Sequence, residues 1–446
     1  MSDTVSHKIH KALKVRLYPS EEQRVILNKT FGCCRVVYNE RLSEHINYYN
    51  TYGDSPNKPK FRGTLPKELR EKKYPWLGED VIAEALGSSQ KHCEQAYSNF
   101  FKSRKSQRKG RKVGYPKFKS KKSHRDSFTL CMIRTRGLMD FDSKTIFIPK
   151  LKHTKFRIAN SSLKSKWMEW FLGATPLNMT VSRNACGEYY CSVLFEREQD
   201  LEQNIKLSNS TGLDFSPGSL YVDSSNNSAP DYKPCKQLKK KKLTKLQRRL
   251  ARKQKGSKNR EKARVKLARF EKHIADSRRD YIEKETLRLV RTYDVIGIED
   301  LNLQGMMKFS HNARNYADTS WYTFTQKLLW KAQFNNCIIV KSDRFYPSSK
   351  TCNHCGYINQ DLTLKDRKWT CPNCGTEIIR DQNAAQNLRD NAISLLTEEI
   401  NSVLGMERTE VMSMEGMEAI YFNGMLSGVS YEVEKIDCEV NQQNFS

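Results

Sequence analysis

The chain has 446 residues, of which 78 are Lys or Arg and 50 are Asp or Glu, so its formal charge is +28. This length allows two to four domains, and the excess of cations predicts a partner that carries phosphates, because each phosphate contact releases condensed counterions. No apolar stretch indicates a secretory signal or a transmembrane helix, and an odd number of cysteines, thirteen, argues against a disulfide-bonded secreted protein. We therefore expect a cytoplasmic protein that is associated with the nucleoid and contacts no membrane.

The first predicted elements are a strand and two helices. Apolar residues alternate with cations over 13–18, which predicts a half-buried strand. Ser20 with Gln23 three residues later is a capping-box pattern, so an amphipathic helix is expected from there toward Tyr48. A second helix is predicted over 81–101.

Two loops in the same part of the chain are basic. The first, 52–66, is rich in Gly and Pro, and the second, 102–125, places Tyr115 and Phe118 among lysines and arginines. These rings either stack on bases or anchor the loop to the core, and the sequence favours neither. The candidate nucleic-acid contacts in this loop are Lys117, Phe118 and Lys119.

Short strands are predicted over residues 127–197. Runs such as 128–130, 145–148 and 189–194 are rich in β-branched and aromatic residues and are separated by turns. A small barrel or sheet is the natural interpretation.

A new unit is predicted after this strand-rich region. The run 211–215 is a short apolar strand that contains one acid, Asp214. A second strand, predicted over 295–300, has the continuous apolar pattern of a buried strand. It ends in acids, of which Glu299 is the first. A further strand is predicted over 337–340.

A strongly basic segment separates the first two of these strands. Residues 233–272 contain 19 Lys or Arg and only two acids, and the stripe of Leu243, Leu246 and Leu250 predicts a helix that a break at 256–257 divides. Because the cations have almost no acids to pair with, contact with a nucleic-acid backbone is favoured over a solvated, salt-bridged helix. The candidate contacts in this segment are Lys239, Lys240, Lys241, Lys242, Arg248 and Arg249.

The C-terminal part is predicted as a helix followed by an acidic tail. Asp381 opens the helix, which is expected to run to Leu395. The last 52 residues, 395–446, carry ten acids and two bases. We expect this tail to be an appendage that is disordered in part.

Four cysteines before that helix form two tight pairs. Cys352 and Cys355 are followed, after 15 residues, by Cys371 and Cys374, which is the spacing of a tetrahedral zinc ribbon. Four thiolates leave no open coordination position, so the predicted Zn²⁺ is structural. His354, inside the first pair, is interpreted as a loop residue and not as a ligand.

Three acids that are far apart in the sequence are candidates for catalysis: Asp214, Glu299 and Asp381. Three acids that converge on one sheet edge repel each other and would bind divalent cations, and a pair of Mg²⁺ ions could activate a water at a phosphodiester. Each acid also has a plainer interpretation. Asp381 could be a helix N-cap, Glu299 a surface acid at a strand end, and Asp214 the partner of an arginine. Sequence spacing alone does not decide between these interpretations.

An ordered set of motifs resembles the TnpB family, transposon-encoded RNA-guided DNA nucleases related to the type V CRISPR effectors. The motifs are Thr211-Gly212-Leu213-Asp214, Gly297-Ile298-Glu299-Asp300-Leu301, Tyr346-Pro347-Ser348-Ser349-Lys350-Thr351-Cys352, Cys371-Pro372-Asn373-Cys374-Gly375 and Arg380-Asp381-Gln382-Asn383-Ala384-Ala385, with Lys14-Val15-Arg16-Leu17-Tyr18-Pro19 and Gly114-Tyr115-Pro116-Lys117-Phe118-Lys119 nearer the N-terminus. The resemblance covers about residues 10 to 395.

The resemblance implies a multidomain α/β protein with a β-barrel. It would have a RuvC-like, RNase H-type nuclease domain with an inserted zinc ribbon, an N-terminal wedge-like barrel and a helical recognition lobe. Asp214, Glu299 and Asp381 would be the three acidic motifs of the nuclease domain. The expected boundaries are 1–19 and 126–206 for the barrel, 20–125 for the lobe, 207–350 and 376–395 for the nuclease domain, 351–375 for the ribbon and 396–446 for the acidic tail.

The resemblance also implies a Mg²⁺-dependent endodeoxyribonuclease of an insertion-sequence transposon. Such an enzyme would bind a guide RNA from the transposon end, check a short motif beside the target in double-stranded DNA, and let guide pairing read the sequence. Asp214 and Asp381 would bridge two Mg²⁺ ions, Glu299 would complete the shell of the second, and water would attack the phosphate and leave a 3′-hydroxyl. Two alternatives remain open: a guide-dependent DNA-binding regulator that does not cut, and a transposase or recombinase accessory protein.

One departure from the family pattern affects the third acidic motif. Ile378 and Ile379 stand before Arg380 and Asp381, where family members often carry a polar, acidic pair. Because Asp381 itself is present, we expect activity, with weaker electrostatics at the metal site.

Overall fold

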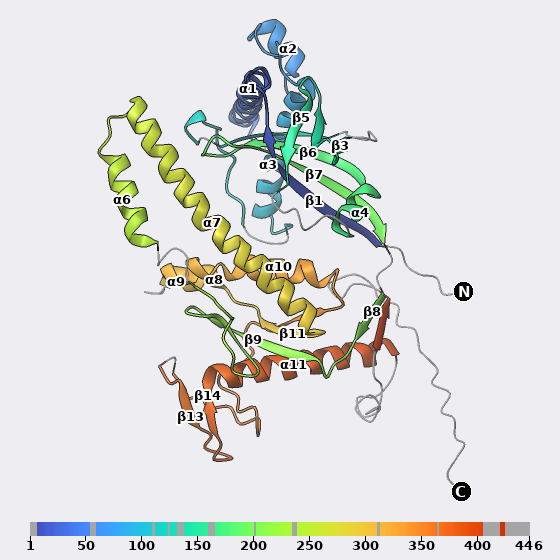
Figure 1. Cartoon of the computed structure of the whole chain (residues 1–446), viewed down its shortest axis with the longest axis vertical. Coiled ribbons are helices and arrows are strands. Elements are labelled where there is room, and N and C mark those ends of the chain that lie inside the picture. Colours follow the sequence, from blue (N-terminus) through green and yellow to red (C-terminus); the bar gives the residue numbers. More distant parts are fainter. Residues whose placement is uncertain are drawn as a thin grey trace, which may run out of the picture. The chain divides into compact units, whose positions relative to one another are not determined.

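The computed structural model describes residues 7–53, 59–108, 112–123, 125–131, 138–158, 166–199, 202–233, 239–309, 313–363, 365–404 and 420–423. The chain divides into two compact units, one formed by Lys8–Gln199 and the other by Asp200–Ser446 together with Met1–His7. Figure 1 labels most of their helices and strands. Each unit is described by itself.

A seven-stranded sheet is the framework of the first unit. Its strand order is β2-β6-β7-β1-β5-β4-β3, so β2 and β3 are the outermost strands. The described strands therefore form an open sheet, and the barrel that the family resemblance implies does not close here. The strands are β1 (His7–Tyr18), β2 (Asp126–Leu130), β3 (Met139–Asp140), β4 (Thr145–Ile148), β5 (Lys152–Arg157), β6 (Thr175–Arg183) and β7 (Tyr189–Gln199).

The strands predicted at 128–130, 145–148 and 189–194 are confirmed within β2, β4 and β7. Neither β5 nor β6 is among the strands that the sequence predicts. In β5 only Thr154 and Phe156 are buried, and the residues between and around them are mostly cations. Two buried positions are too few to give a clear alternating pattern.

The two predicted helices of the first unit are confirmed as α1 (Glu21–Tyr52) and α3 (Ala83–Arg104), which pack against each other and against β2. The predicted capping box begins α1, because the Ser20 hydroxyl accepts from the backbone N–H of Gln23 at 3.3 Å and the Gln23 side chain accepts from the Ser20 N–H at 3.0 Å. Two short helices were not predicted. They are α2 (Pro66–Lys72) and α4 (Lys166–Leu172), and a 3₁₀ turn (Lys121–Ser123) lies in the second basic loop.

A four-stranded sheet is the centre of the second unit, with the strand order β10-β9-β11-β12. β9 is antiparallel to β10 and parallel to β11, and β11 is parallel to β12. The strands are β9 (Ser210–Ser216), β10 (Leu220–Asp223), β11 (Val295–Glu299) and β12 (Ile338–Ser342). The three strands predicted in this part of the sequence are all present in it.

Six helices of this unit lie in the described residues, and none of the described helices in either unit is long and apolar enough to cross a membrane. They are α6 (Lys240–Ala251), α7 (Lys258–Thr292), α8 (Leu303–Phe309), α9 (Ala313–Thr319), α10 (Trp321–Ala332) and α11 (Arg380–Leu404).

Different helices pack on the two faces of the sheet. On one face, Leu213, Ile296 and Ile298 join a hydrophobic core with residues of α7 and α10. On the other face, α11 runs across β9 and β11 (Figure 1). Because side chains alternate between the faces of a strand, Asp214 and Glu299, each next to a core residue, lie on the face that α11 covers.

Two glycines allow α11 to lie directly against the strands. A Cβ atom on Gly212 would be 1.8 Å from the carbonyl oxygen of Ala385, and one on Gly297 would be 2.2 Å from the carbonyl oxygen of Leu388. No side chain fits at either point, so helix and strand backbones are in contact. Asp381 lies one helical turn before Ala385, so this contact fixes the position of the first turn of α11 beside the sheet.

The basic segment forms a helical hairpin of α6 and α7 (Figure 1). Ser257 is the N-cap of α7, and its hydroxyl accepts from the backbone N–H of Arg260 at 3.1 Å. The predicted leucine stripe is confirmed by its burial, because Leu243 is buried and both Leu246 and Leu250 are half-buried. The break predicted at 256–257 therefore marks the turn of the hairpin.

The C-terminal part departs from the predicted appendage. α11 extends to Leu404, beyond the predicted helix end at Leu395. β15 (Ile420–Asn423) pairs antiparallel with β8 (Glu202–Ile205), so part of the acidic tail joins the second unit as a strand. The remaining tail residues, 405–419 and 424–446, lie outside the described residues.

Candidate functional site

Strand register places two of the predicted acids side by side. β9 and β11 are parallel, with Leu213 opposite Ile298, and one residue further along the two strands come Asp214 and Glu299. Adjacent strands are about 4.8 Å apart. Because both acids lie on the face that α11 covers, their carboxyl groups project to the same side of the sheet.

The third acid comes from the first turn of α11. The carboxylate of Asp381 is paired with two arginines. Nη1 of Arg367 lies 3.1 and 3.0 Å from its two oxygens, and Arg380 donates from Nε and Nη2 to Oδ1 at 3.1 and 2.9 Å. Asp381 is the second residue of the helix, so the plainer interpretation of this acid as an N-cap is wrong.

The electrostatic effects of Glu299 and Asp381 on Asp214 indicate that the three acids lie near one another. Burial raises the pKa of Asp214 well above its ordinary value of 3.8, and the charges of Glu299 and Asp381 raise it further, while Arg380 and Arg367 act in the opposite direction. Burial also raises the pKa of Glu299. Carboxyl groups perturb one another in this way only when they are close together.

Among the described residues, Asp214 has no partner at hydrogen-bond or ion-pair distance. It is 8% exposed, and none of the described residues forms a hydrogen bond or an ion pair with its carboxylate. Its plainer interpretation as the partner of an arginine is therefore not found at contact distance. A buried, unpaired carboxylate is unfavourable unless a cation lies beside it, and carboxylate oxygens are the ligands that Mg²⁺ and Mn²⁺ prefer.

The three carboxylates therefore fit a hard divalent cation, although their oxygen atoms are not closely clustered. In the described part of the chain, only the cysteine quartet brings three or more potential ligand atoms within 4.8 Å of one another. Glu299 is not a free surface acid, because the hydroxyl of Ser348 donates to its Oε1 at 2.8 Å.

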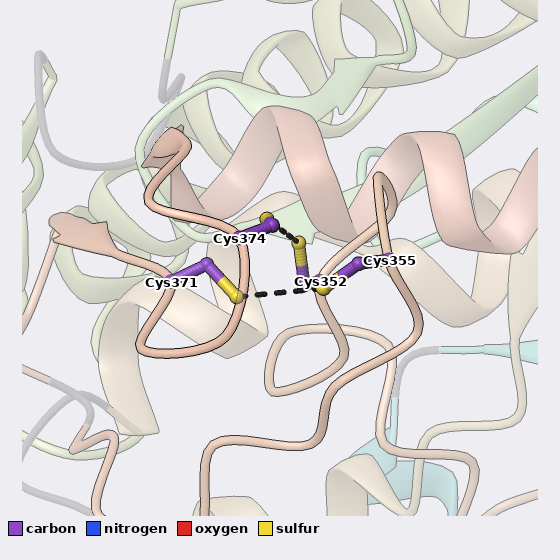
Figure 2. A group of neighbouring side chains, drawn as sticks. All are labelled: Cys352, Cys355, Cys371 and Cys374. Atoms are coloured by element: carbon purple, nitrogen blue, oxygen red, sulfur yellow. Dashed lines mark hydrogen bonds between the residues drawn. The ribbon is translucent and has the colours of Figure 1, made fainter.

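The four predicted zinc ligands meet in one cluster. Figure 2 shows Cys352, Cys355, Cys371 and Cys374 approaching each other from two loops, and their sulfur atoms all lie within 4.8 Å of one another. Two sulfur pairs are separated by 3.7 and 3.6 Å. A tetrahedral Zn²⁺ with Zn–S bonds of about 2.3 Å requires sulfurs roughly 3.8 Å apart, whereas a disulfide requires about 2.05 Å. The quartet therefore fits a structural zinc ion.

Backbone turns and a small core support this cluster. Gly356 and Gly375, directly after the two pairs, have φ of 75° and 68°, a conformation that glycine adopts without strain. The ribbon strands β13 (Lys368–Thr370) and β14 (Glu377–Ile379) pair antiparallel, and Ile378 packs with Trp369 against the cysteines. The departure from the family pattern at Ile378 thus contributes to the core of the ribbon.

The ribbon should depend on its metal. Burial raises the pKa of Cys352 to about 12, so Zn²⁺ must displace a proton to bind there. We expect Cys371→Ser to lose the bound zinc and to lower the melting temperature, because structural zinc contributes directly to folding. Zinc content and thermal unfolding are the measurements, and Cys131→Ser, at an exposed cysteine outside the quartet, is the control. Full zinc content in Cys371→Ser would contradict the assignment.

The predicted basic contacts fall on different surfaces. Lys240, Lys241, Arg248 and Arg249 line a hollow on α6 together with Thr244, Lys245, Arg252 and Lys253. The side chains of two other predicted residues contact α7 instead. Lys239 Nζ lies 3.3 Å from Nε2 of His273, and Lys242 Nζ lies 4.9 Å above the ring of Phe270.

The two aromatic residues of the second basic loop have different environments. Tyr115 contacts the rings of Tyr97 and Phe100 and hydrogen-bonds to the Tyr97 hydroxyl, so it anchors the loop to α3. Phe118 is 57% exposed and remains available for stacking. Lys119 lies over the ring of Tyr38, 3.9 Å from its centre. Lys117 is exposed.

Several residues at the site were not singled out from the sequence. Arg367 reaches Asp381 only because the ribbon folds back onto the start of α11, and no spacing in the sequence indicates that contact. The spacing of Asn383 and Asn387 could have indicated a shared polar site, because residues four apart lie on one face of a helix. Both asparagines contact the segment before the first cysteine pair.

Three family models match separate parts of the chain. A "Helix-turn-helix domain" model matches residues 9–54, a "Probable transposase" model matches 192–310 and a "Cas12f1-like, TNB domain" model matches 321–388. The first stretch folds here as β1 and α1. The third contains α10, β12, the cysteine ribbon and the start of α11 with Asp381.

The chain is similar to known relatives and to a chain in a solved structure over most of its length. A "Putative RNA-guided DNA endonuclease" of Streptomyces pristinaespiralis is 31% identical over 384 residues, which is 85% of this chain and 89% of the relative. The "Putative RNA-guided DNA endonuclease InsQ" of Escherichia coli K12 is 28% identical over 401 residues, 84% of this chain and 91% of the relative. A chain in the "Cryo-EM structure of the Cas12f1-sgRNA-target DNA complex" has a TM-score of 0.49 at 13% identity, covering 86% of this chain and 99% of that one.

Proposed function

The chain belongs to the TnpB family of RNA-guided DNA endonucleases, and from that premise we propose that it cuts double-stranded DNA at sites that a bound guide RNA selects. The observation that carries the proposal is the meeting of Asp214, Glu299 and Asp381 on one face of a sheet. A buried, unpaired Asp214 near two further acids, in a unit that also contains a strongly basic hairpin, suits a phosphate-bearing substrate and divalent cations.

We assign the second unit as a RuvC-like, RNase H-type nuclease domain with the ribbon inserted before its third acid. An antiparallel strand pair followed by two parallel strands, with a helix lying directly on them, supports this assignment. We assign residues 20–125 as the recognition lobe and the seven-stranded sheet as the wedge-like domain.

The acids and the two arginines have different proposed roles in hydrolysis. Two Mg²⁺ ions held by the acids would activate a water and stabilise the leaving 3′-oxygen of the target phosphodiester. Asp214, Glu299 and Asp381 would hold these ions. Arg367 and Arg380 hold the Asp381 carboxylate in this structure, and both are cations that would suit a nearby phosphate.

The exposed cations of α6 are assigned to the phosphates of the guide RNA or its heteroduplex with the target. The guide comes from the transposon end, and its pairing reads the target after a short adjacent motif has been checked. Phe118 is assigned as a stacking residue in the same complex.

The proposal is tested with the purified ribonucleoprotein, its RNA sequenced, on a target duplex in Mg²⁺. We expect a discrete RNA to copurify and the duplex to be cut at the guided site. Guided binding without cuts would instead identify a regulator. Cleavage or joining that needs no RNA would identify a transposase-type protein.

The Mg²⁺ requirement should rise as the pH falls. Because the pKa values of Asp214 and Glu299 are raised, protons compete with Mg²⁺ at a higher pH than at ordinary carboxylates. Between about pH 8 and pH 5.5 we expect the half-saturating Mg²⁺ concentration to increase steadily. Guide binding over the same range is the control, since Lys and Arg do not titrate there. A half-saturating concentration that is independent of pH would contradict the raised pKa values.

The α6 face should account for part of the salt dependence of RNA binding. Replacing Lys241, Lys245, Arg248 and Arg252 by alanine removes four exposed cations that lie three or four residues apart on one face. We expect the slope of log affinity against log salt to decrease by roughly 3, at about 0.7–0.9 per phosphate contact. Lys284→Ala, at an exposed cation paired with Asp280, should leave the slope unchanged. An unchanged slope in the fourfold variant would show that α6 does not contact phosphates.

A further inference from the structure

Ser348 connects the acid cluster with the cysteine ribbon. It is 3% exposed, and its Oγ donates to Oε1 of Glu299 at 2.8 Å. Within the described residues this is the only hydrogen bond that the Glu299 carboxylate receives. Ser348 itself belongs neither to the acids nor to the cysteines, and it precedes Cys352 by four residues.

Two asparagines of α11 hold the backbone around Ser348. The side-chain amide of Asn387 donates to the carbonyl oxygens of Ser348 and Thr351, both at 2.7 Å. The amide of Asn383 donates to the same Thr351 carbonyl, also at 2.7 Å. Asn387 is 4% exposed, and its NH₂ group supplies the two donors that this arrangement needs, which a carboxylate would lack.

The oxygen of each asparagine side chain contacts the first cysteine pair. Asn353, inside that pair, donates its backbone N–H to Oδ1 of Asn383 at 2.9 Å and its side-chain amide to Oδ1 of Asn387 at 3.0 Å. Buried polar groups that are satisfied on both sides form a rigid network. The segment from Ser348 to Asn353 is therefore fixed to the helix that also carries Asp381.

A fixed donor matters for a carboxylate that binds a metal ion. A glutamate side chain rotates freely when nothing holds it, and a hydrogen bond to one oxygen limits this rotation while the other oxygen stays available. Groups that orient metal ligands in this way typically change metal affinity by about 10- to 100-fold when they are removed. Ser348 has the geometry for such a role.

We propose that Ser348 is a positioning residue that orients Glu299 for divalent cations. Asn383 and Asn387, which also contact Asn353 of the ribbon, hold Ser348 in place. The inference rests on the proposed function, because it takes Glu299 as a metal ligand. A merely structural Ser348 would affect unfolding but not the affinity for the metal. The two roles therefore differ in a measurable quantity.

The test measures Mn²⁺ binding to the guide-loaded full-length protein by electron paramagnetic resonance. The variants are Ser348→Ala, Ser348→Thr, which keeps the hydroxyl, and Ser349→Ala. Ser349 is the matched control because it is the adjacent serine and makes no hydrogen bond to Glu299 among the described residues. The half-saturating Mg²⁺ concentration for cleavage, the cleavage rate at saturating Mg²⁺ and the melting temperature are recorded alongside.

We expect Ser348→Ala to weaken Mn²⁺ binding by about tenfold or more and to raise the half-saturating Mg²⁺ concentration by a similar factor. Saturating Mg²⁺ should restore most of the cleavage rate, Ser348→Thr should recover most of the affinity, and Ser349→Ala should match the wild type. Unchanged Mn²⁺ affinity in Ser348→Ala would overturn the proposal.

Two further outcomes are distinguishable. If Ser348→Ala does not fold, Ser348→Cys, with a weaker donor of similar size, must show an intermediate loss of Mn²⁺ affinity, and wild-type affinity there would overturn the proposal. If the wild type binds Mn²⁺ no better than Asp214→Asn, the proposed function itself fails, whatever Ser348 does.

Discussion

Replacing Asp214 by asparagine is expected to abolish guided cleavage and, at the same time, to raise the melting temperature of the metal-free protein. The cleavage rate should fall by roughly 10⁴-fold, since members of a catalytic unit are not replaced by their neighbours. Guide binding should remain, because the basic hairpin is untouched. The opposite directions of the two effects make this prediction specific to a functional acid.

The sign of the stability effect follows from the raised pKa of Asp214. A carboxyl group whose pKa is higher in the folded state binds protons more tightly there, so stability falls as the pH rises through the interval between the unfolded and the folded pKa. At neutral pH without a metal ion, Asp214 must either carry an unfavourable buried charge or take up a proton, and both destabilise the fold relative to a neutral side chain. Asparagine removes the charge and keeps the shape. A gain of 1 kcal/mol would raise the melting temperature by about 2–4 °C.

The matched control is Asp223→Asn on the neighbouring strand. Asp223 is buried to a similar degree, 7% exposed, but its Oδ1 accepts from the backbone N–H groups of Ser225 and Asn227 at 3.0 and 2.8 Å. We expect this variant to gain no stability and to retain cleavage. Adding Mg²⁺ should raise the melting temperature of the wild type more than that of Asp214→Asn. Wild-type cleavage by Asp214→Asn would refute the catalytic assignment.

Gly212→Ala should damage both the fold and the reaction, although it adds one methyl group. Its Cβ would be 1.8 Å from the carbonyl oxygen of Ala385 and 2.7 Å from the backbone nitrogen of Arg389, so α11 must move away from β9. Such overpacking costs about 1–3 kcal/mol. Because Asp381 is in the first turn of the same helix, we expect cleavage to fall at least about 100-fold, the effect of a displacement of roughly 1 Å.

Gly218→Ala is the control for this substitution, because a Cβ there meets nothing within 4 Å. Thermal unfolding and guided cleavage are measured for both variants below the melting temperature of the weaker one. We expect Gly218→Ala to behave as the wild type. If Gly212→Ala cut DNA at the wild-type rate, the close contact of α11 with the sheet would not be what places Asp381.

Elements that depend on residues close together in the sequence could be predicted from local patterns. The capping box at Ser20 begins a real helix, and the spacing of the four cysteines gives a cluster with the dimensions of a zinc site. The acid strands were also predictable, because apolar runs of that length bury both faces of a strand. In contrast, β5 was missed because its two buried residues lie among cations.

The convergence of the acids could not be derived from spacing. It depends on the parallel register of β9 and β11 and on the contact of α11 with Gly212 and Gly297. Residue types alone do not give either of these. The family resemblance implied the three acids, but neither it nor the local pattern indicated that Arg367 would pair with Asp381, since that contact arises only when the ribbon folds.

The central claim is that Asp214, Glu299 and Asp381 share divalent cations, and the most direct test is to locate Mn²⁺ by anomalous scattering in crystals of the ribonucleoprotein with target DNA. The account predicts Mn²⁺ between these three carboxylates and beside a target phosphate. Manganese bound only elsewhere, in a complex that still cuts its guided target, would contradict it.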